Sequence, residues 1–255
     1  MSSGDLAFTW WGHASVTVEI NGVRIALDPL FSDRLVHLRR YTASPTDIAW
    51  DADLILISHL HADHLHRTSL RRFPADVPIL MPRGGESLLA KLGPERVHGV
   101  VPGEVHEIAG TTVTVLPATH EGRRGPQSKA VGPALGFRVD AGARSFWFPG
   151  DTELRDDMAE VGPVDLALVP IGGWGPTLED GHMDPVAGAA AVELVGATTV
   201  VPVHWGTFWP VGMASVRRAN HEHLFRSPGR RFVEAMADSD IEVLLADHGE
   251  RVALS

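Results

Sequence analysis

Short runs in which apolar and polar residues alternate are spread over most of this chain, and a period of two is typical of β-strands. The runs Phe8–Ile20 and Val23–Leu27 are joined by Asn21-Gly22, a dipeptide that favours a type I′ hairpin turn. Leu54–Ile57 is apolar at every position, as expected of a strand buried on both faces. Further strands are expected at Pro78–Met81, Val97–Val101, Thr111–Leu116, Ala134–Val139, Arg144–Phe148, Asp165–Pro170, Thr199–Val203 and Glu242–Leu245.

Helical segments lie between and after these strands. They are expected at Leu65–Arg72, Gly85–Leu92, Pro185–Leu194 and Arg230–Asp238, and Asp184 is the expected N-cap of the third. Strands in both halves of the chain, with helices around them, predict an α/β fold in which two mixed sheets pack face to face with helices outside. A length of 255 residues fits one such domain over residues 1–255.

Composition narrows the kinds of site that the chain can build. Because there is no cysteine, disulfides and thiolate-bound zinc are excluded, and histidine, aspartate and glutamate remain as metal ligands. A formal net charge of −10 argues against nonspecific binding to nucleic acid, which depends on clustered cations. The N-terminal residues lack the features of a signal peptide, and the longest apolar stretch is interrupted by Glu193 and Pro202. We therefore expect a cytoplasmic protein without an integral membrane segment.

Three histidines and an aspartate fall within six residues directly after the strand Leu54–Ile57. His59 and His61 are two residues apart, so they project to the same side of an extended backbone, and Asp63 and His64 follow as the chain turns. Neutral imidazole and carboxylate suit zinc, manganese or iron, and four donors so close together are too many for one metal. The cluster therefore predicts a site for two metals.

In three further places, an expected strand leads directly to a residue that can bind a metal. These residues are His120, Asp151 and His204. Functional side chains gather where buried strands end at one edge of a sheet, so we expect the three to join the first cluster.

The order of these residues resembles that of the metallo-β-lactamase superfamily. The resemblance rests on His-x-His-x-Asp-His at positions 59–64, a later single histidine, Gly150-Asp151-Thr152 and a late histidine, and it covers nearly the whole chain. It implies a four-layer αββα sandwich. Four further motifs are similar to the branch that holds N-acyl-phosphatidylethanolamine phospholipase D and the L-ascorbate-6-phosphate lactonases: Trp11–Ser15, Leu27–Pro29, Gly181–Pro185 and Val203–Phe208.

The resemblance also implies how two divalent metal ions would be held. His59, His61 and His120 would bind one metal, Asp63, His64 and His204 would bind the other, and Asp151 would bridge them. Zinc is the expected metal, and manganese and iron are alternatives.

Three side chains are candidates for catalysis beside the metals. Asp63 could orient the nucleophile or handle a proton, His182 could act on the leaving group or bind an anion, and His13 is expected to face the site. Asp28 could accept a hydrogen bond from a ligating imidazole, or it could form a turn. His66 stands where the family usually has an acidic or small residue, and we expect it on a helix surface.

The expected reaction is hydrolysis by a metal-bound hydroxide, because two metals about 3.5–4 Å apart can activate water and polarise the bond under attack. The leading substrate class is a phosphodiester or a phosphorylated small molecule, since the site favours anions. A lactonase or other carboxylic-ester hydrolase is the alternative, and an iron-dependent oxidoreductase on the same fold is a more distant one. No nucleic-acid partner is expected, while a homo-oligomer is compatible with the tryptophan-rich loops.

Arg123 and Arg124 follow His120 and are candidates for binding an anionic group of the substrate. The aromatic residues Trp174, Trp205 and Phe208 are candidates for the pocket wall, and ordinary core packing is the alternative for them. The segments expected to form this wall are Asp33–Thr46, Gly172–Gly181 and Trp205–Gly212.

Overall fold

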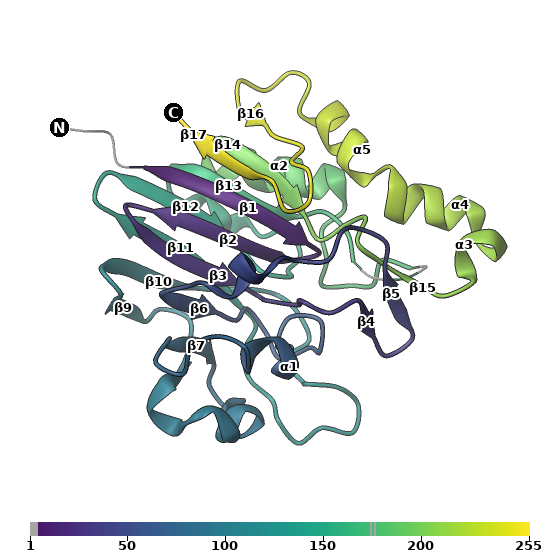
Figure 1. Cartoon of the computed structure of the whole chain (residues 1–255). Coiled ribbons are helices and arrows are strands. Elements are labelled where there is room, and N and C mark those ends of the chain that lie inside the picture. The colour runs from purple at the N-terminus through teal and green to yellow at the C-terminus, as the bar shows by residue number, and fades with distance from the viewer. Residues whose placement is uncertain (1–4, 174, 176) are drawn as a thin grey trace.

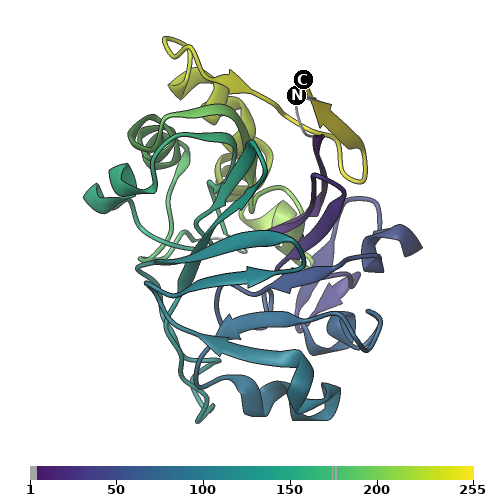
Figure 2. The same ribbon diagram turned by 90° about the vertical axis from the view of Figure 1, so that its left-hand side faces the viewer.

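The computed structural model describes residues 5–173, 175 and 177–255 of the chain. In this described part, most strands belong to two seven-stranded mixed sheets that lie face to face (Figure 1). The view in Figure 2 looks between the layers, with strands from the N-terminal part of the chain on one side and later strands on the other. The predicted α/β arrangement of two packed sheets is therefore confirmed.

The first sheet has the strand order β17-β1-β2-β3-β6-β7-β8. Its strands are β17 (Arg251–Leu254), β1 (Leu6–Gly12), β2 (Ser15–Ile20), β3 (Val23–Leu27), β6 (Leu54–Leu56), β7 (Ile79–Pro82) and β8 (Val97–Val100). Pairing is antiparallel from β17 to β3 and parallel from β3 to β8. All three residues of β6 are buried, as its continuous apolar sequence predicts.

The second sheet has the strand order β16-β14-β13-β12-β11-β10-β9. Its strands are β16 (Glu242–Val243), β14 (Ala197–Val203), β13 (Val164–Pro170), β12 (Arg144–Phe148), β11 (Leu135–Ala141), β10 (Thr111–Pro117) and β9 (Val105–Ile108). The strands from β9 to β12 are antiparallel, and those from β12 to β16 are parallel. The main core fills the space between the two sheets with large side chains such as Phe8, Ile25, Phe137 and Phe146.

Most helical segments cover the outer faces of the two sheets, whereas those over residues 213–226 lie to the side of the sheets (Figure 1). The helices are α1 (Arg67–Leu70), α2 (Pro185–Val195), α3 (Met213–Val216), α4 (Arg218–His221) and α5 (Pro228–Ala235), with the short 3₁₀ or π turns η1 (Asp47–Trp50), η2 (Glu86–Leu92), η3 (Pro94–Arg96), η4 (Asp156–Val161) and η5 (Glu222–Arg226). Asp184 caps α2, as expected, because its carboxylate accepts hydrogen bonds from the Val186 and Ala187 amides at 3.1 and 2.9 Å. None of the helices in the described residues has the length and apolar run needed to cross a bilayer.

Several expected boundaries were wrong. The run Phe8–Ile20 is two strands, because positive φ angles at Gly12 (101°) and His13 (54°) turn the chain between β1 and β2. The helix expected at Leu65–Arg72 is reduced to the single turn α1. The strands β9 and β17 were missed, since both are half-exposed edge strands with weak apolar patterns.

A third, three-stranded sheet projects beside the two large ones (Figure 1). Its order is β15-β5-β4, with β15 (Phe208–Pro210), β5 (Leu38–Arg40) and β4 (Arg34–Leu35). Arg40 ties it to the first sheet, because its buried guanidinium donates to the carbonyl oxygens of Trp11 and Leu30, both at 2.7 Å. Burial lowers the pKa of Arg40 to about 10, so it remains charged at neutral pH.

The hairpin between β2 and β3 gives a test of the fold. Asn21 has φ 49°, and its Nδ2 donates to the Ala141 carbonyl at 2.6 Å, which joins the two sheets. Asn21→Ala should lower the free energy of unfolding by about 2 kcal/mol, because it removes a hydrogen bond and replaces asparagine by a residue that tolerates the left-handed region less well. Asn21→Gly loses only the hydrogen bond and should cost about 1 kcal/mol. Urea titration of both variants checks this, and equal costs would show that the backbone strain is absent.

Candidate metal centre

The histidine-rich segment begins where β6 ends, at the edge where the two sheets meet. Its shape is held by Arg124, whose Nη1 donates to the carbonyl oxygens of Leu60, His61 and Leu65 at 2.7, 3.1 and 2.7 Å. Three carbonyl oxygens gathered around one guanidinium nitrogen fix the backbone of a loop that has little regular structure. The segment therefore presents its side chains from a rigid turn.

His59, His61 and His120 form one group in which a nitrogen of each ring lies within 4.8 Å of the others. The Nε2 of His120 is 3.2 Å from Nδ1 of His61. The other nitrogen of His120, Nδ1, donates to the Gly181 carbonyl at 2.9 Å, so Nε2 is left as a lone pair facing His61. Only a glycine at position 181 leaves room for this contact, because a Cβ there would lie 2.7 Å from His120 Nδ1. Gly181 also has a φ of +82°, which L side chains rarely adopt.

A second group consists of His13, Asp63, His64 and His204, all of them buried. Nε2 of His64 and Nε2 of His204 are 3.1 Å apart, and His204 Nδ1 donates to the Gly172 carbonyl at 3.0 Å. His13 Nε2 lies 2.9 Å from Asp63 Oδ2. The turn after β1 thus brings His13 into the site, as expected.

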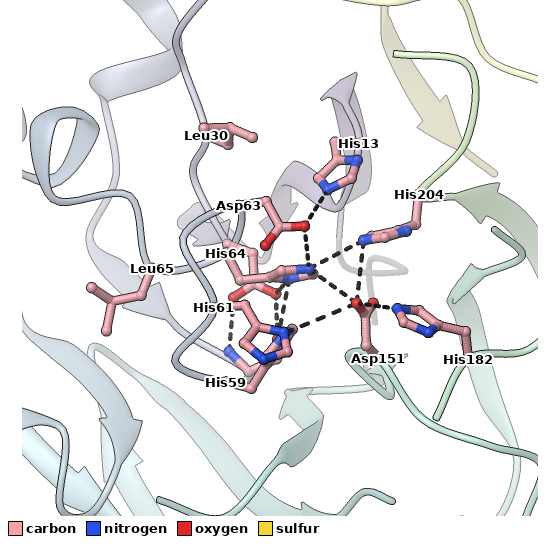
Figure 3. A network of polar contacts seen from close by, with 12 residues as sticks. His13, Leu30, His59, His61, Asp63, His64, Leu65, Asp151, His182 and His204 are labelled. Atoms are coloured by element: carbon pink, nitrogen blue, oxygen red, sulfur yellow. Dashed lines mark hydrogen bonds and ion pairs between the residues drawn. The ribbon is translucent and has the colours of Figure 1, made fainter. Parts of the chain in front are cut away.

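Asp151 lies between the two groups (Figure 3). Its Oδ2 is 3.1 Å from His64 Nε2, 3.3 Å from His204 Nε2 and 4.0 Å from His59 Nε2. The structure therefore brings together all seven residues predicted to bind metal; three form one group, three form the other together with His13, and Asp151 lies between them. Their role as ligands stays a prediction.

The donor atoms fit a pair of divalent cations. Two contacts between imidazole nitrogens, His61–His120 and His64–His204, are only 3.1–3.2 Å long, a distance at which two lone pairs need a proton or a cation between them. Nε2 of His59 and Oδ1 of Asp151 are buried without a hydrogen-bond partner among the described residues. Buried polar atoms without partners are costly, and a bound cation would satisfy them.

The charge states of the site also suit a cation. Burial lowers the pKa of His120 to about 4 and that of His59 and His204 well below the usual range, so these rings are neutral. Burial opposes ionisation of Asp63 and Asp151, but the surrounding imidazoles outweigh it and hold both pKa values well below normal. The site thus offers neutral imidazoles and ionised carboxylates.

His64 has the opposite shift. Burial would lower its pKa, but Asp151, Asp63 and Asp28 together raise it well above normal. Binding of a metal at this ring therefore releases a proton. Asp28 accepts from His64 Nδ1 at 2.7 Å and from the Ser58 amide at 2.7 Å, which confirms the hydrogen bond expected of Asp28.

His182 closes the site on the cavity side. Its Nε2 is 3.4 Å from Asp151 Oδ2, and its Nδ1 is 3.0 Å from the Glu179 carbonyl oxygen. Burial would lower the pKa of His182, but the hydrogen bond and charge of Asp151 raise it.

His66 is outside the site, where its ring accepts a hydrogen bond from the Ser69 amide and caps α1.

A cavity of about 780 Å³ opens onto these residues. Its wall includes Leu35–Leu38 from the β4–β5 hairpin, and it also includes Arg123 and Arg124. Three acidic residues of this wall, Glu121, Glu179 and Asp180, were not named as candidates. Glu179 and Asp180 lie in the segment Gly172–Gly181 that was expected to form the wall, and Glu121 directly follows the predicted ligand His120.

The expected aromatic wall needs correction. Phe208 is only 2% exposed and packs against Leu30 and Leu38, below the Arg40 guanidinium. Trp205 packs against the core, and its Nε1 donates to the Pro202 carbonyl at 3.0 Å. Neither lines the cavity, because apolar contacts turn both rings inward. Trp174 lies outside the described residues. Arg124 lines the cavity, but its Nη1 is already committed to the histidine loop.

Comparisons with known proteins agree with this arrangement. The family model described as "Beta-lactamase superfamily domain" matches residues 23–205. The N-acyl-phosphatidylethanolamine-hydrolyzing phospholipase D 1 of Caenorhabditis elegans is 31% identical over 83% of this chain, which spans 66% of that relative. A UPF0173 metal-dependent hydrolase of Methanopyrus kandleri is 30% identical, and the match covers 96% of this chain and 98% of the relative.

Solved structures show the same fold at lower sequence identity. The metallo hydrolase Igni18 from Ignicoccus hospitalis has a TM-score of 0.75 at 22% identity, with 98% of this chain and 99% of that chain covered. An isothiocyanate hydrolase from Delia radicum gut bacteria has a TM-score of 0.73 at 16% identity, with 97% and 99% covered. On the evidence of the family match, the relatives and the fold, the chain belongs to the metallo-β-lactamase superfamily of metal-dependent hydrolases.

Proposed function

We propose that this protein hydrolyses phosphodiesters with two divalent metal ions, most simply zinc. One observation carries the proposal: a group of three histidines and a second group of histidines with Asp63 meet at the ionised Asp151, on the wall of a cavity of about 780 Å³. The relative named as a phospholipase D supports a phosphodiester, although this chain spans only 66% of that protein.

The bound metals would supply an activated water and would polarise the bond under attack. The chain's own residues orient the reactants. Asp63 is held by His13 at 2.9 Å and is ionised, so its second oxygen can accept a proton from the nucleophile. His182 faces the cavity, and its raised pKa lets it donate a proton from Nε2 to a leaving oxygen.

The charges on the cavity wall favour a diester over a monoester. Arg123 and Arg124 supply two cations, but Glu121, Glu179 and Asp180 place three carboxylates on the wall. A phosphate monoester carries about −1.5 to −2 charge near pH 7, whereas a diester carries a single negative charge. Repulsion from the three carboxylates therefore penalises the monoester more strongly.

The same carboxylates support one alternative. A neutral lactone or carboxylic ester meets no repulsion at the outer wall, and its carbonyl oxygen can be polarised in the same site. Lactone hydrolysis is therefore the second candidate function.

A substrate panel distinguishes these candidates. Bis(p-nitrophenyl) phosphate should be cleaved with a kcat/KM at least about ten-fold above that of p-nitrophenyl phosphate, since ~1.4 kcal/mol of extra repulsion produces that ratio. Cleavage of a simple γ-lactone with neither phosphate ester accepted would favour the alternative. Preference for the monoester would contradict the charge argument.

Replacing Asp63 tests the metal centre itself. Asp63→Asn should lower kcat for the diester by at least about a hundred-fold and reduce the metal content, because it removes both a proton acceptor and an anionic ligand. Asp76→Asn, at an exposed aspartate, is the control. Metal analysis and steady-state kinetics make the test, and full activity in Asp63→Asn would sink the proposal.

Asp28 should act on the metal through His64. Asp28→Asn keeps the side-chain shape but removes the charge that stabilises the His64 Nδ1–H, so metal affinity should fall about 10–100-fold. The matched control is Asp53→Asn, whose carboxylate accepts from the Arg24 amide on the surface. Chelator competition measures both affinities, and equal values in the two variants would show that Asp28 only supports the turn.

A further inference from the structure

The projecting three-stranded sheet and the helices after it carry a charge opposite to that of the rest of the chain. We define the basic lobe as residues 31–42 and 208–231, which contain β4, β5, β15, α3, α4, η5 and the first four residues of α5. These two segments hold eight arginines and two acidic residues, a formal charge of +6. The chain as a whole is −10, so the remainder is −16. A positive lobe on an acidic protein favours an anionic partner.

Four arginines of the lobe are left without an ion-pair partner in the described part of the chain. Arg34, Arg39, Arg217 and Arg218 are exposed, and none of them forms an ion pair with another described residue. Arg34 and Arg39 are also direct cross-strand partners in the β4–β5 hairpin. Like charges opposite each other destabilise a sheet, so the pair costs stability in the isolated protein. An anion at this face would remove that cost.

Apolar side chains are exposed in the same lobe. Val36 is 90% exposed at the tip of the β4–β5 hairpin. Val211 is 60% exposed and lies beside this hairpin, because the Val211 amide donates to the His37 carbonyl at 3.3 Å. Val216, at the end of α3, is 79% exposed. Val36 has φ 53°, a conformation that is strained for a β-branched residue. A valine at this position therefore lowers the stability of the isolated protein, both through backbone strain and through the exposure of its apolar side chain.

The shape of the lobe selects among anionic partners. The hairpin, β15 and α3 project from the side of the two large sheets (Figure 1), and the valines lie at the ends of these separate elements. Projecting apolar tips beside arginines suit insertion into the headgroup region of an anionic lipid bilayer, where valine leaves water and arginine meets phosphate.

We propose that the basic lobe docks this protein on anionic phospholipid surfaces. Val36 also lines the cavity, so docking would bring the cavity mouth to the lipid–water interface. Docking itself needs neither the metals nor the hydrolytic activity, so it can be tested separately from the proposed function.

The experiment is cosedimentation of the full chain with vesicles, at low and high salt. Binding is expected to vesicles that contain phosphatidylglycerol and not to vesicles of phosphatidylcholine alone, and it should weaken with salt. The double variant Arg34→Gln/Arg39→Gln should bind roughly thirty-fold more weakly, since each arginine near an anionic surface contributes about 1 kcal/mol. Its hydrolysis of a soluble diester should be unchanged, because neither arginine lines the cavity.

Val36→Asn tests the apolar contact. Asparagine tolerates a positive φ, so the variant should be at least as stable to heat as the parent, while vesicle binding falls roughly ten-fold with the loss of a buried valine. The matched controls are Lys91→Gln/Arg71→Gln for the charge and Val105→Asn, at a 59% exposed valine of β9, for the apolar contact.

Three outcomes would overturn the docking proposal. The first is failure of the parent protein to bind anionic vesicles at low salt, and the second is an equal loss of binding in the control variants. The third is self-association of the parent in sedimentation velocity that the lobe variants abolish, which would assign the surface to a second copy of the chain.

Discussion

The site depends on the cost of burying Asp151. This carboxylate is 3% exposed, one of its oxygens has no partner among the described residues, and its neighbours are mostly imidazoles that are neutral in the fold. An ionised carboxylate in such surroundings needs positive charge nearby, and among the described residues His64 and His182, whose pKa values are raised, supply part of it. Divalent cations meet the same need more fully. The fold therefore leaves the buried carboxylate short of positive charge, and bound cations would supply it.

The architecture explains how distant segments share that site. β6, β10, β12 and β14 come from both sheets, and each is followed by one or more of the clustered ligands. Because the strands are buried and regular, the start of each following loop is fixed, and short loops then set the side-chain positions within a few ångström. The supporting hydrogen bonds from Arg124 and Asp28 complete this placement.

This division explains what the sequence could and could not predict. The residues of the candidate metal centre could be found because they follow apolar strands that the period of two marks clearly. The turn at Gly12-His13 and the short helix α1 could not, because positive φ angles and tertiary contacts decide them. Phe208 and Trp205 were misassigned to the cavity wall, since an aromatic residue in a loop has the same sequence signal whether it faces solvent or core. The acidic wall residues, such as Glu179, depend on loop conformation for their direction.

The carbonyl groups of Gly172 and Gly181 orient His204 and His120, and they stand at the two ends of one cavity loop. The same loop carries Glu179 and Asp180 on the cavity wall. A change in the loop that accommodated a different substrate would therefore shift the two imidazoles and alter their hold on the cations. Substrate range and metal affinity are thus coupled through the main chain, and divergence of this loop would have to preserve its two ends while its middle varied.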